Sequence, residues 1–338
     1  MTGSIGLCLS GGGYRAMLFH TGTLWRLNEL GWLSRLDRVS SVSGGSIAAG
    51  ALAKAWPSLK FTDGIAVNLG AEVVTPLRKL ASTGLDVGVV VRGLLRPWRS
   101  VGEELATAYA RHLFGDLHLT DITTDGPSFI FTATDLCDGS QWWFARQPGV
   151  TLATAVAASS AFPPFLSPVV TPDPRPDRDG KTVLSDAGVF DNLGLDAVVG
   201  QCETVLVSDA GKRMRSLRTV SRIWIHQMLR VSNVTDNQVR ELRTGSLLKS
   251  YVDGEFSGAY WGSYSDIENF KLANALRAPH EHTKKLAETP TRLTRFPSLL
   301  QERLINWGYA VCDAAMRRHV DPDAKTPAKF PFPGSGVG

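Results

Sequence analysis

The chain has 338 residues, of which 43% are hydrophobic and 20% charged, with a formal net charge of +4. This composition is ordinary for a globular enzyme and excludes a disordered chain, a coiled coil and the strongly basic surface of a nucleic-acid-binding domain. The longest apolar stretch near the N-terminus is interrupted by Ser10, by Gly11 to Gly13 and by Arg15, which excludes a signal peptide or a membrane span there. We therefore expect a cytoplasmic protein with one hydrophobic core.

The first predicted elements form two strand-turn-helix units. Residues 4–9 predict a strand, and after a glycine turn apolar residues recur at helical spacing over residues 14–30. The same order returns with a strand-like run over residues 38–42 and a helix of small residues over 47–56. Two such units in succession favour a parallel sheet.

The remaining elements predict a mixed sheet followed by helices. Further strands are predicted at residues 128–134, 142–145, 182–185 and 204–208, and helices at 101–114, 152–159 and 193–200. Residues 171–177 are too proline-rich for a helix or an interior strand, so we expect an exposed loop. Strand signals fade after residue 209, and residues 216–243 predict an arginine-rich helix. We therefore expect one α/β domain over residues 1–320, with a core at 5–211, a helical extension at 212–320 and a flexible tail at 321–338.

Ser43 is the candidate nucleophile. It follows a predicted strand and opens a helix, with Ser41 two residues before it and Gly45 two residues after it. This spacing is close to the G-x-S-x-G elbow, in which small residues flank a serine on a strained turn. Taken alone, the pattern also fits a glycine-rich helix start in which Ser43 is only a cap.

The consecutive glycines Gly11, Gly12 and Gly13 are candidates for an oxyanion hole. Their backbone N–H groups can converge on one anionic point without Cβ crowding, and Arg15 adds a positive charge nearby. The run from Gly11 to Ala16 also satisfies the dinucleotide-binding pattern G-x-G-x-x-A. That alternative lacks an acidic residue at the end of a second strand, although Asp37 lies just before one.

The catalytic base is ambiguous from the residues themselves. Ser-Asp-Ala-Gly occurs twice after a predicted strand, so both Asp186 and Asp209 qualify. An ordinary aspartate with a pKa near 4 can assist a serine only if burial or a hydrogen bond changes its basicity, which requires a closed cleft. The seven histidines fit no alternative catalytic triad, and the four scattered cysteines show no metal-ligand spacing.

Together these motifs resemble the patatin-like phospholipase family, in the same order along the chain. The oxyanion loop corresponds to residues 10–15 and the elbow to residues 41–46, and residues 157–165 are similar to the small-residue helix and proline turn that wall the family's active site. The third motif begins at Asp186 and continues through an aromatic residue, Asp191-Asn192 and Gly194, which the segment after Asp209 does not. The resemblance therefore selects Asp186. Ser41 and Ala187 depart from the family's glycines.

The resemblance covers about residues 5–211 and implies a three-layer α/β/α fold with a central, mostly parallel sheet. It also implies a metal-free, cofactor-free Ser43–Asp186 dyad that hydrolyses acyl esters of phospholipids or other lipids through an acyl-serine intermediate. Two alternatives remain open from the sequence. One is an acyltransferase that uses the same dyad, and the other is a non-catalytic nucleotide-binding protein that uses the glycine loop.

Two segments are candidates for contact with a membrane, at which the protein would be peripherally associated. Residues 87–98 are apolar with interspersed arginines and a tryptophan, which is typical of a lid or of an interfacial segment. Residues 213–230 carry several arginines with Trp224 and Leu229 nearby, and could contact anionic head groups or form a solvated helix face. The expected partners are thus an acyl lipid and a membrane surface, with no nucleic acid.

Overall fold

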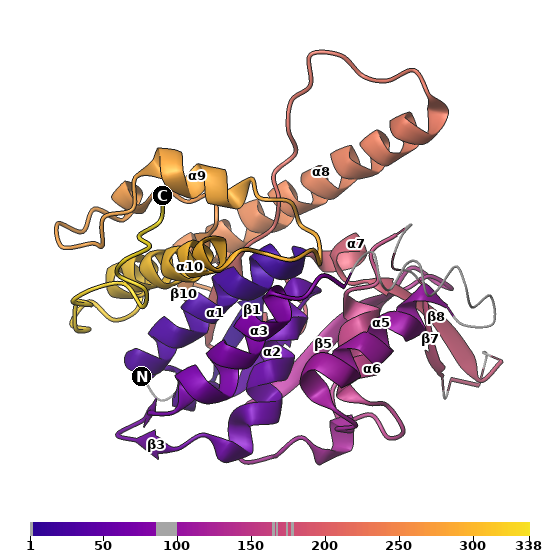
Figure 1. The fold of residues 1–338 in the computed structure, drawn as a ribbon, viewed down its shortest axis with the longest axis horizontal. Helices are drawn as coiled ribbons and strands as arrows, with labels where there is room; N and C mark the ends of the chain where they lie inside the picture. Colours follow the sequence, from indigo (N-terminus) through magenta and orange to yellow (C-terminus); the bar gives the residue numbers. More distant parts are fainter. Residues whose placement is uncertain (1–2, 86–99, 164–165, 167, 174, 177–178) are drawn as a thin grey trace.

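The computed structural model describes residues 3–85, 100–163, 166, 168–173, 175–176 and 179–338 (Figure 1). The candidate lid at residues 87–98 lies outside the described residues. Within the described part of the chain, no helix has both the length and the apolar character that a membrane crossing requires.

An eight-stranded sheet forms the centre of the molecule, in the order β10-β9-β1-β2-β5-β8-β7 with β6 paired to β5. Neighbours from β10 to β5 run parallel, whereas β6, β7 and β8 are antiparallel to their neighbours. The strands are β1 (Ile5–Leu9), β2 (Arg38–Ser41), β5 (Ser128–Asp135), β6 (Gln141–Phe144), β7 (Val169–Pro172), β8 (Lys181–Asp186), β9 (Thr204–Asp209) and β10 (Ser257–Gly262). A separate hairpin pairs β3 (Phe61–Thr62) with β4 (Ile65–Ala66).

The central strands are buried on both faces, which is why β1 and β9 are nearly continuous apolar runs. One face packs against a large cluster contributed by helices on that side. These helices include α1 (Gly13–Glu29), α2 (Gly44–Ala55), α3 (Thr75–Ala81), α5 (Val101–Tyr109), α6 (Leu152–Ser159) and α10 (Ser298–His319). A short helix, α9 (His280–Ala287), lies beside α10.

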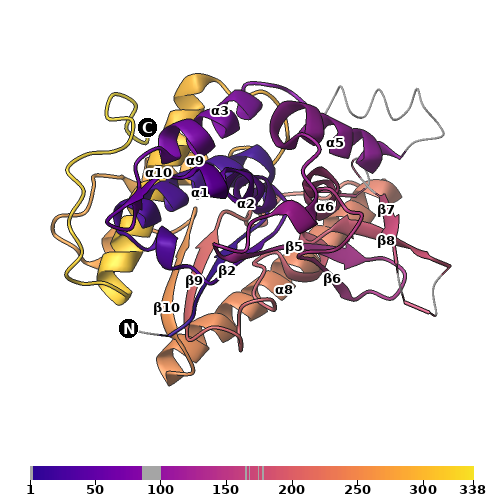
Figure 2. The same cartoon turned by 90° about the horizontal axis from the view of Figure 1, so that it is seen from below.

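The other face of the sheet is covered by the long helix α8 (Trp224–Asp253), which lies on the opposite side from α1 and α2 in Figure 2. Leu247 of α8 packs with Leu193 and Val198 against the β1 and β9 side chains that point to this face. The three layers therefore form the expected α/β/α sandwich around a mostly parallel sheet.

Most of the predicted core elements are confirmed, and three predictions are wrong. Residues 193–200 form turns rather than a helix; the helix there is the short α7 (Gly188–Asp191), and the Asp191 carboxylate accepts hydrogen bonds from the backbone N–H groups of Leu193 and Leu195. The predicted loop at 171–177 begins inside β7, which can hold Pro172 because it is an edge strand. The sequence shows no clear strand pattern after residue 209, so β10 was not predicted.

The C-terminal residues 321–338, which the sequence predicts as a flexible tail, contain no helix or strand and contact the helical layer. Asn306 of α10 donates to the carbonyls of Phe332 and Gly336, each at 2.8 Å. Phe332 also packs edge-on against Trp25 of α1. These contacts bind the tail to the outer surface of the helical layer.

Candidate active site

Ser43 lies at a sharp turn between the end of β2 and the start of α2. Its φ of 50° is in the left-handed region, which a non-glycine residue adopts only at a cost of about 1–3 kcal/mol. The side chain is 8% exposed. The next residue must be glycine, because a Cβ on Gly44 would lie 2.1 Å from the backbone oxygen of Gly13. The turn thus places the backbone after Ser43 in close contact with the glycine loop at Gly13.

Ser41, which replaces the glycine usual in this motif, is accommodated by hydrogen bonds. Its hydroxyl donates to the carbonyl of Ile130 on β5 at 3.3 Å and accepts from Ser46 at 3.0 Å. The extra hydroxymethyl group therefore ties the elbow to the neighbouring strand. Ala187 is equally tolerated, since its φ of −61° suits any L-residue.

Ser159, at the end of α6, joins the elbow to the strand that carries Asp186. Its hydroxyl accepts a hydrogen bond from the Ser43 backbone N–H at 2.9 Å and lies 2.8 Å from the Ser46 hydroxyl. Its carbonyl accepts from the Ala187 N–H at 3.3 Å. Sequence reasoning placed this segment in the wall of the active site but did not single out Ser159. The only signal in the sequence is the pair Ser159-Ser160 at the end of a helix whose immediately preceding residues are apolar.

Asp186 reaches Ser43 because of the strand register. Ser41 on β2 pairs with Phe131 on β5, and two residues further along β5 Ala133 pairs with Asp186 on the antiparallel β8. Asp186 therefore arrives at the level of the elbow, and its carboxylate accepts hydrogen bonds from the Ser43 side chain and, at 2.7 Å, from the Gly188 N–H. Burial raises the pKa of Asp186 to about 7, despite these two hydrogen bonds.

Asp209, the rival base, has a different environment. Although it is also buried, its carboxylate forms an ion pair with Arg240 at 2.5 Å and accepts hydrogen bonds from the Tyr260 hydroxyl and the Gly211 N–H. These partners hold the pKa of Asp209 below its usual value against the effect of burial. The two Ser-Asp-Ala-Gly segments thus differ in their surroundings. The Asp186 carboxylate is desolvated beside Ser43, whereas the Asp209 carboxylate is neutralised by Arg240 and holds further hydrogen bonds.

The glycine loop lies beside Ser43, but its three N–H groups are not equivalent. A Cβ on Gly11 would lie 3.3 Å from the Cβ of Ser43, which shows how closely the loop approaches. The Gly11 N–H donates to the carbonyl of Asn192 at 3.1 Å, so our expectation of Gly11 as an oxyanion donor needs correction. Within the described part of the chain, the N–H groups of Gly12 and Gly13 have no protein acceptor and are the remaining candidates.

Arg15 does not direct its terminal nitrogens toward Ser43, which corrects a second expectation. The side chain is fully buried, and these nitrogens donate to the carbonyls of Ala210, Ala287 and Thr289. Burial lowers the pKa of this guanidinium to about 10. Arg15 therefore fastens the start of α1 to the loop after β9 and to the segment after α9.

The structure also accounts for the residues of the alternative predictions. Asp37 accepts a hydrogen bond from the Ile5 N–H at 2.7 Å, at the amino ends of β1 and β2, whereas the glycine loop lies at the carboxyl end of β1. Asp37 is therefore on the wrong edge of the sheet for a ribose bound at that loop. His20 is buried between the Ser10 carbonyl and the Ser208 hydroxyl, and burial lowers its pKa to about 4. It is a neutral packing residue.

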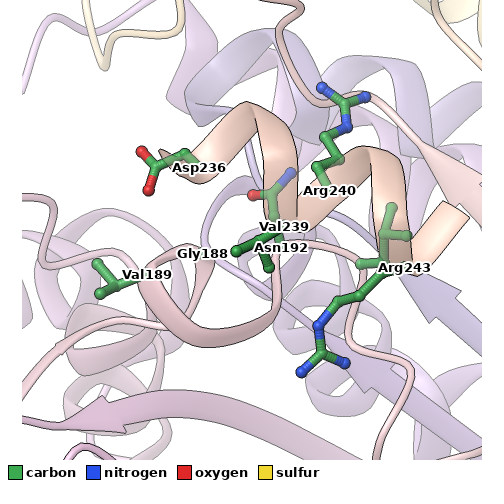
Figure 3. Close-up of a pocket in the computed structure, with 8 residues that line it drawn as sticks. Gly188, Val189, Asn192, Asp236, Val239, Arg240 and Arg243 are labelled. Atoms are coloured by element: carbon green, nitrogen blue, oxygen red, sulfur yellow. The ribbon is translucent and has the colours of Figure 1, made fainter. Parts of the chain in front are cut away.

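A small pocket lies next to Asp186, between α7 and α8 (Figure 3). Gly188, Val189 and Asn192 line it from the α7 side, and Asp236, Val239, Arg240 and Arg243 line it from α8. The negative charge of Asp236 contributes to the raised pKa of Asp186. Helix α8 therefore influences the site electrostatically as well as covering the sheet.

Residues 7–199, more than half of the chain, match the family model described as patatin-like phospholipase. No curated protein matches the sequence. Among solved structures, human GIVD cytosolic phospholipase A2 is similar with a TM-score of 0.52 at 13% identity, over 91% of this chain and 58% of that one.

The same human protein in complex with methyl gamma-linolenyl fluorophosphonate gives a TM-score of 0.51 at 12% identity, over 92% of this chain and 57% of that one. VipD from Legionella pneumophila gives a TM-score of 0.40 at 14% identity, over 92% and 66%. The chain thus spans less than two thirds of the length of these structures, and the likeness to the human enzyme concerns the fold. The extent of the family match shows that the chain belongs to the patatin-like phospholipase family.

Proposed function

We propose that this protein is a serine acyl hydrolase that cleaves carboxylic ester bonds of phospholipids or other acyl lipids. The proposal depends chiefly on one observation, the hydrogen bond between the Ser43 side chain on its strained turn and the desolvated carboxylate of Asp186. A serine hydroxyl is a weak nucleophile and needs such a partner to remove its proton. Membership of a phospholipase family and the fold shared with human cytosolic phospholipase A2 support a lipid substrate.

In the first half-reaction, Ser43 Oγ attacks the ester carbonyl carbon while its proton passes to the Asp186 carboxylate. The carbonyl oxygen becomes an oxyanion, which accepts hydrogen bonds from the Gly12 and Gly13 N–H groups at the amino end of α1. When the tetrahedral intermediate collapses, Asp186 returns the proton to the leaving alcohol. Acyl-Ser43 and a free alcohol are the products of this step.

In the second half-reaction, a water molecule attacks the acyl-Ser43 carbonyl while Asp186 accepts one of its protons. Collapse of this intermediate gives the proton back to Ser43 Oγ and releases the carboxylic acid. A carboxyl with a pKa of about 7 suits both transfers, because it is close to the pH at which it must accept and donate a proton.

A fluorophosphonate probe tests the proposal directly, because only an activated serine reacts with it. The wild type should be labelled and Ser43→Ala should not. Ser58→Ala, at an exposed serine beyond the far end of α2, is the matched control and should be labelled like the wild type. Equal labelling of wild type and Ser43→Ala would overturn the proposal.

Hydrolysis of a soluble short-chain ester separates the two aspartates. Asp186→Asn should lower kcat by at least about a thousandfold, a loss on the scale of removing a member of a catalytic unit. Asp209→Asn should retain activity in its folded fraction. Loss in Asp209→Asn with retention in Asp186→Asn would reverse the assignment of the base.

A further inference from the structure

One part of the molecule projects from the compact body. After β9 the chain leaves as an extended loop, turns, and returns as the first turns of α8 (Figure 1). We call residues 212–235 the arm. Every residue from 212 to 229 is exposed, which is unusual for a segment so rich in apolar side chains.

The arm exposes large apolar side chains along much of its length. Trp224, Met228 and Val231, which are 71%, 53% and 63% exposed, follow the i, i+4, i+7 spacing and therefore share one face of α8. The loop adds Leu217, Val220 and Ile223, all more than half exposed. Leaving so much apolar surface in water is unfavourable, so this face is suited to a partner that covers it.

The charge of the arm indicates which partner fits. Its residues include six basic side chains and no aspartate or glutamate. The basic residues are Lys212, Arg213, Arg215, Arg218, Arg222 and Arg230. Two copies of the arm packed face to face would bring these like charges together, which disfavours self-association. Apolar and aromatic side chains interspersed with arginines are instead typical of segments that lie in the interface of an anionic bilayer.

The base of the arm is held at the edge of the candidate active site. Arg240 of α8 pairs with Asp209 and donates to the Lys212 carbonyl at 2.8 Å. It therefore joins α8 to the end of β9 and to the first residue of the arm. Asn192 connects this base to the oxyanion loop: its carbonyl accepts from the Gly11 N–H, and its side-chain amide lies against Gly211. A partner bound to the arm would therefore lie near the glycine loop and the candidate active site.

We propose that the arm is a docking surface for anionic phospholipid membranes, with Trp224, Met228 and the loop side chains inserted among the lipids and with Arg218 and Arg222 on the head groups. Arg215 instead pairs with Glu288 at 3.3 Å. The choice of a lipid surface rests on the proposed function. The arm includes residues 213–230, one of the two segments that the sequence predicts to contact a membrane, and the structure adds its projection, its shared apolar face and its attachment to the site.

Vesicle co-sedimentation tests this inference with the full chain. We compare vesicles of phosphatidylcholine alone with vesicles that also contain phosphatidylserine, at low and high salt, using Ser43→Ala so that hydrolysis does not alter the lipids. Binding should require phosphatidylserine and weaken as salt is raised. Binding that is indifferent to both would overturn the proposal.

Paired variants show whether the arm itself binds. Trp224→Ala with Met228→Ala should reduce vesicle partitioning by about tenfold or more, because apolar insertion is lost. The matched control is Leu242→Ala with Val252→Ala, two exposed apolar residues on the part of α8 outside the arm, and it should bind normally. Equal binding by the two double variants would reject the arm as the contact.

The arginines are tested against a control variant that loses the same amount of positive charge. Arg218→Gln with Arg222→Gln should weaken binding by about fivefold per arginine. Lys60→Gln with Lys79→Gln removes the same charge from exposed positions elsewhere and should have little effect. Equal losses would mean that net charge, and not the arm, determines binding.

Activity and assembly measurements separate this inference from the proposed function. In the otherwise wild-type enzyme, all four double variants should hydrolyse a soluble ester normally, and only the arm variants should lose activity on vesicles. A wild type that binds vesicles but hydrolyses no ester contradicts the proposed function alone. Arm variants that change a dimer to a monomer without altering vesicle binding would show a self-association surface and overturn the docking proposal.

Discussion

The backbone N–H of Ser43 donates to the hydroxyl of Ser159 at 2.9 Å, while the carbonyl of Ser159 accepts from the residue after Asp186. One residue at the end of α6 therefore holds both halves of the proposed dyad. Because the elbow is strained at Ser43, its geometry depends on such external contacts. Ser159 is thus a positioning residue for the proposed reaction.

We predict that Ser159→Ala lowers kcat on a soluble ester by about ten- to a hundredfold, because a small misplacement of a nucleophile is enough for such a loss. KM should change little, since Ser159 does not contact the substrate in the proposed mechanism. Ser159→Thr, which keeps the hydroxyl, should recover part of the rate. A purely structural role would lower the melting temperature in both variants without this difference in kcat.

A second prediction concerns the pH dependence of activity. Asp186 must be ionised to accept the proton of Ser43, and burial raises its pKa to about 7. The kcat/KM for a soluble ester should therefore rise with pH and reach half its maximum near pH 7, well above the value for an ordinary aspartate. A profile that is flat from about pH 5 to 8 would contradict this account of Asp186.

The same raised pKa predicts that Asp186 lowers stability at alkaline pH. The folded protein holds this proton more tightly than the unfolded chain, so the contribution of Asp186 to the free energy of unfolding is lost as pH rises from about 4 through 7. Asp186→Asn removes this loss. Denaturant unfolding should show the variant to be more stable than the wild type at pH 8, by an amount that shrinks toward pH 4. An equal difference at both pH values would contradict this prediction.

Much of the fold could be predicted from the sequence because its signals are local. The apolar run of residues 5–9, the glycines after it and the small residues around Ser43 each specify a strand, a turn or a helix start within a few positions. The β10 strand could not be found in this way, because its residues do not show a strong strand pattern and it is held by pairing with β9.

The site was less predictable than the fold, because its functional differences arise from long-range contacts. The repeated Ser-Asp-Ala-Gly motif gives Asp186 and Asp209 the same immediate sequence, although the residues that follow differ. Their different environments arise from long-range contacts: Asp209 pairs with Arg240, 31 residues further on, whereas Asp186 lies beside Ser43. In the same way, the glycine loop was apparent from its sequence, but the occupation of the Gly11 N–H by the Asn192 carbonyl was not. Arg15 was placed near the loop correctly, although its terminal donors serve other carbonyls.

A fourth prediction follows from the ion pair between Asp209 and Arg240. Asp209→Asn leaves the Arg240 guanidinium, whose side chain is only 13% exposed, without its counter-ion, which should lower the free energy of unfolding by about 3–5 kcal/mol. Adding Arg240→Met to this variant should restore part of the loss, because the unpaired charge is removed. Denaturant unfolding of both single variants and the double variant measures this coupling. Strictly additive losses would show that the two side chains are not coupled.

The last prediction concerns the proposed oxyanion loop, where Gly12 has a φ of 141° and a Cβ would lie 3.1 Å from the Ala210 carbonyl oxygen. Gly12→Ala should shift the loop and displace one N–H donor, which lowers kcat by about a hundred- to a thousandfold with little change in KM. Gly139→Ala is the control, since Gly139 also has a positive φ of 75° but open space around its Cβ position. Both variants should lose stability from backbone strain, and only Gly12→Ala should lose activity. Full activity in a folded Gly12→Ala variant would exclude this loop from the proposed reaction.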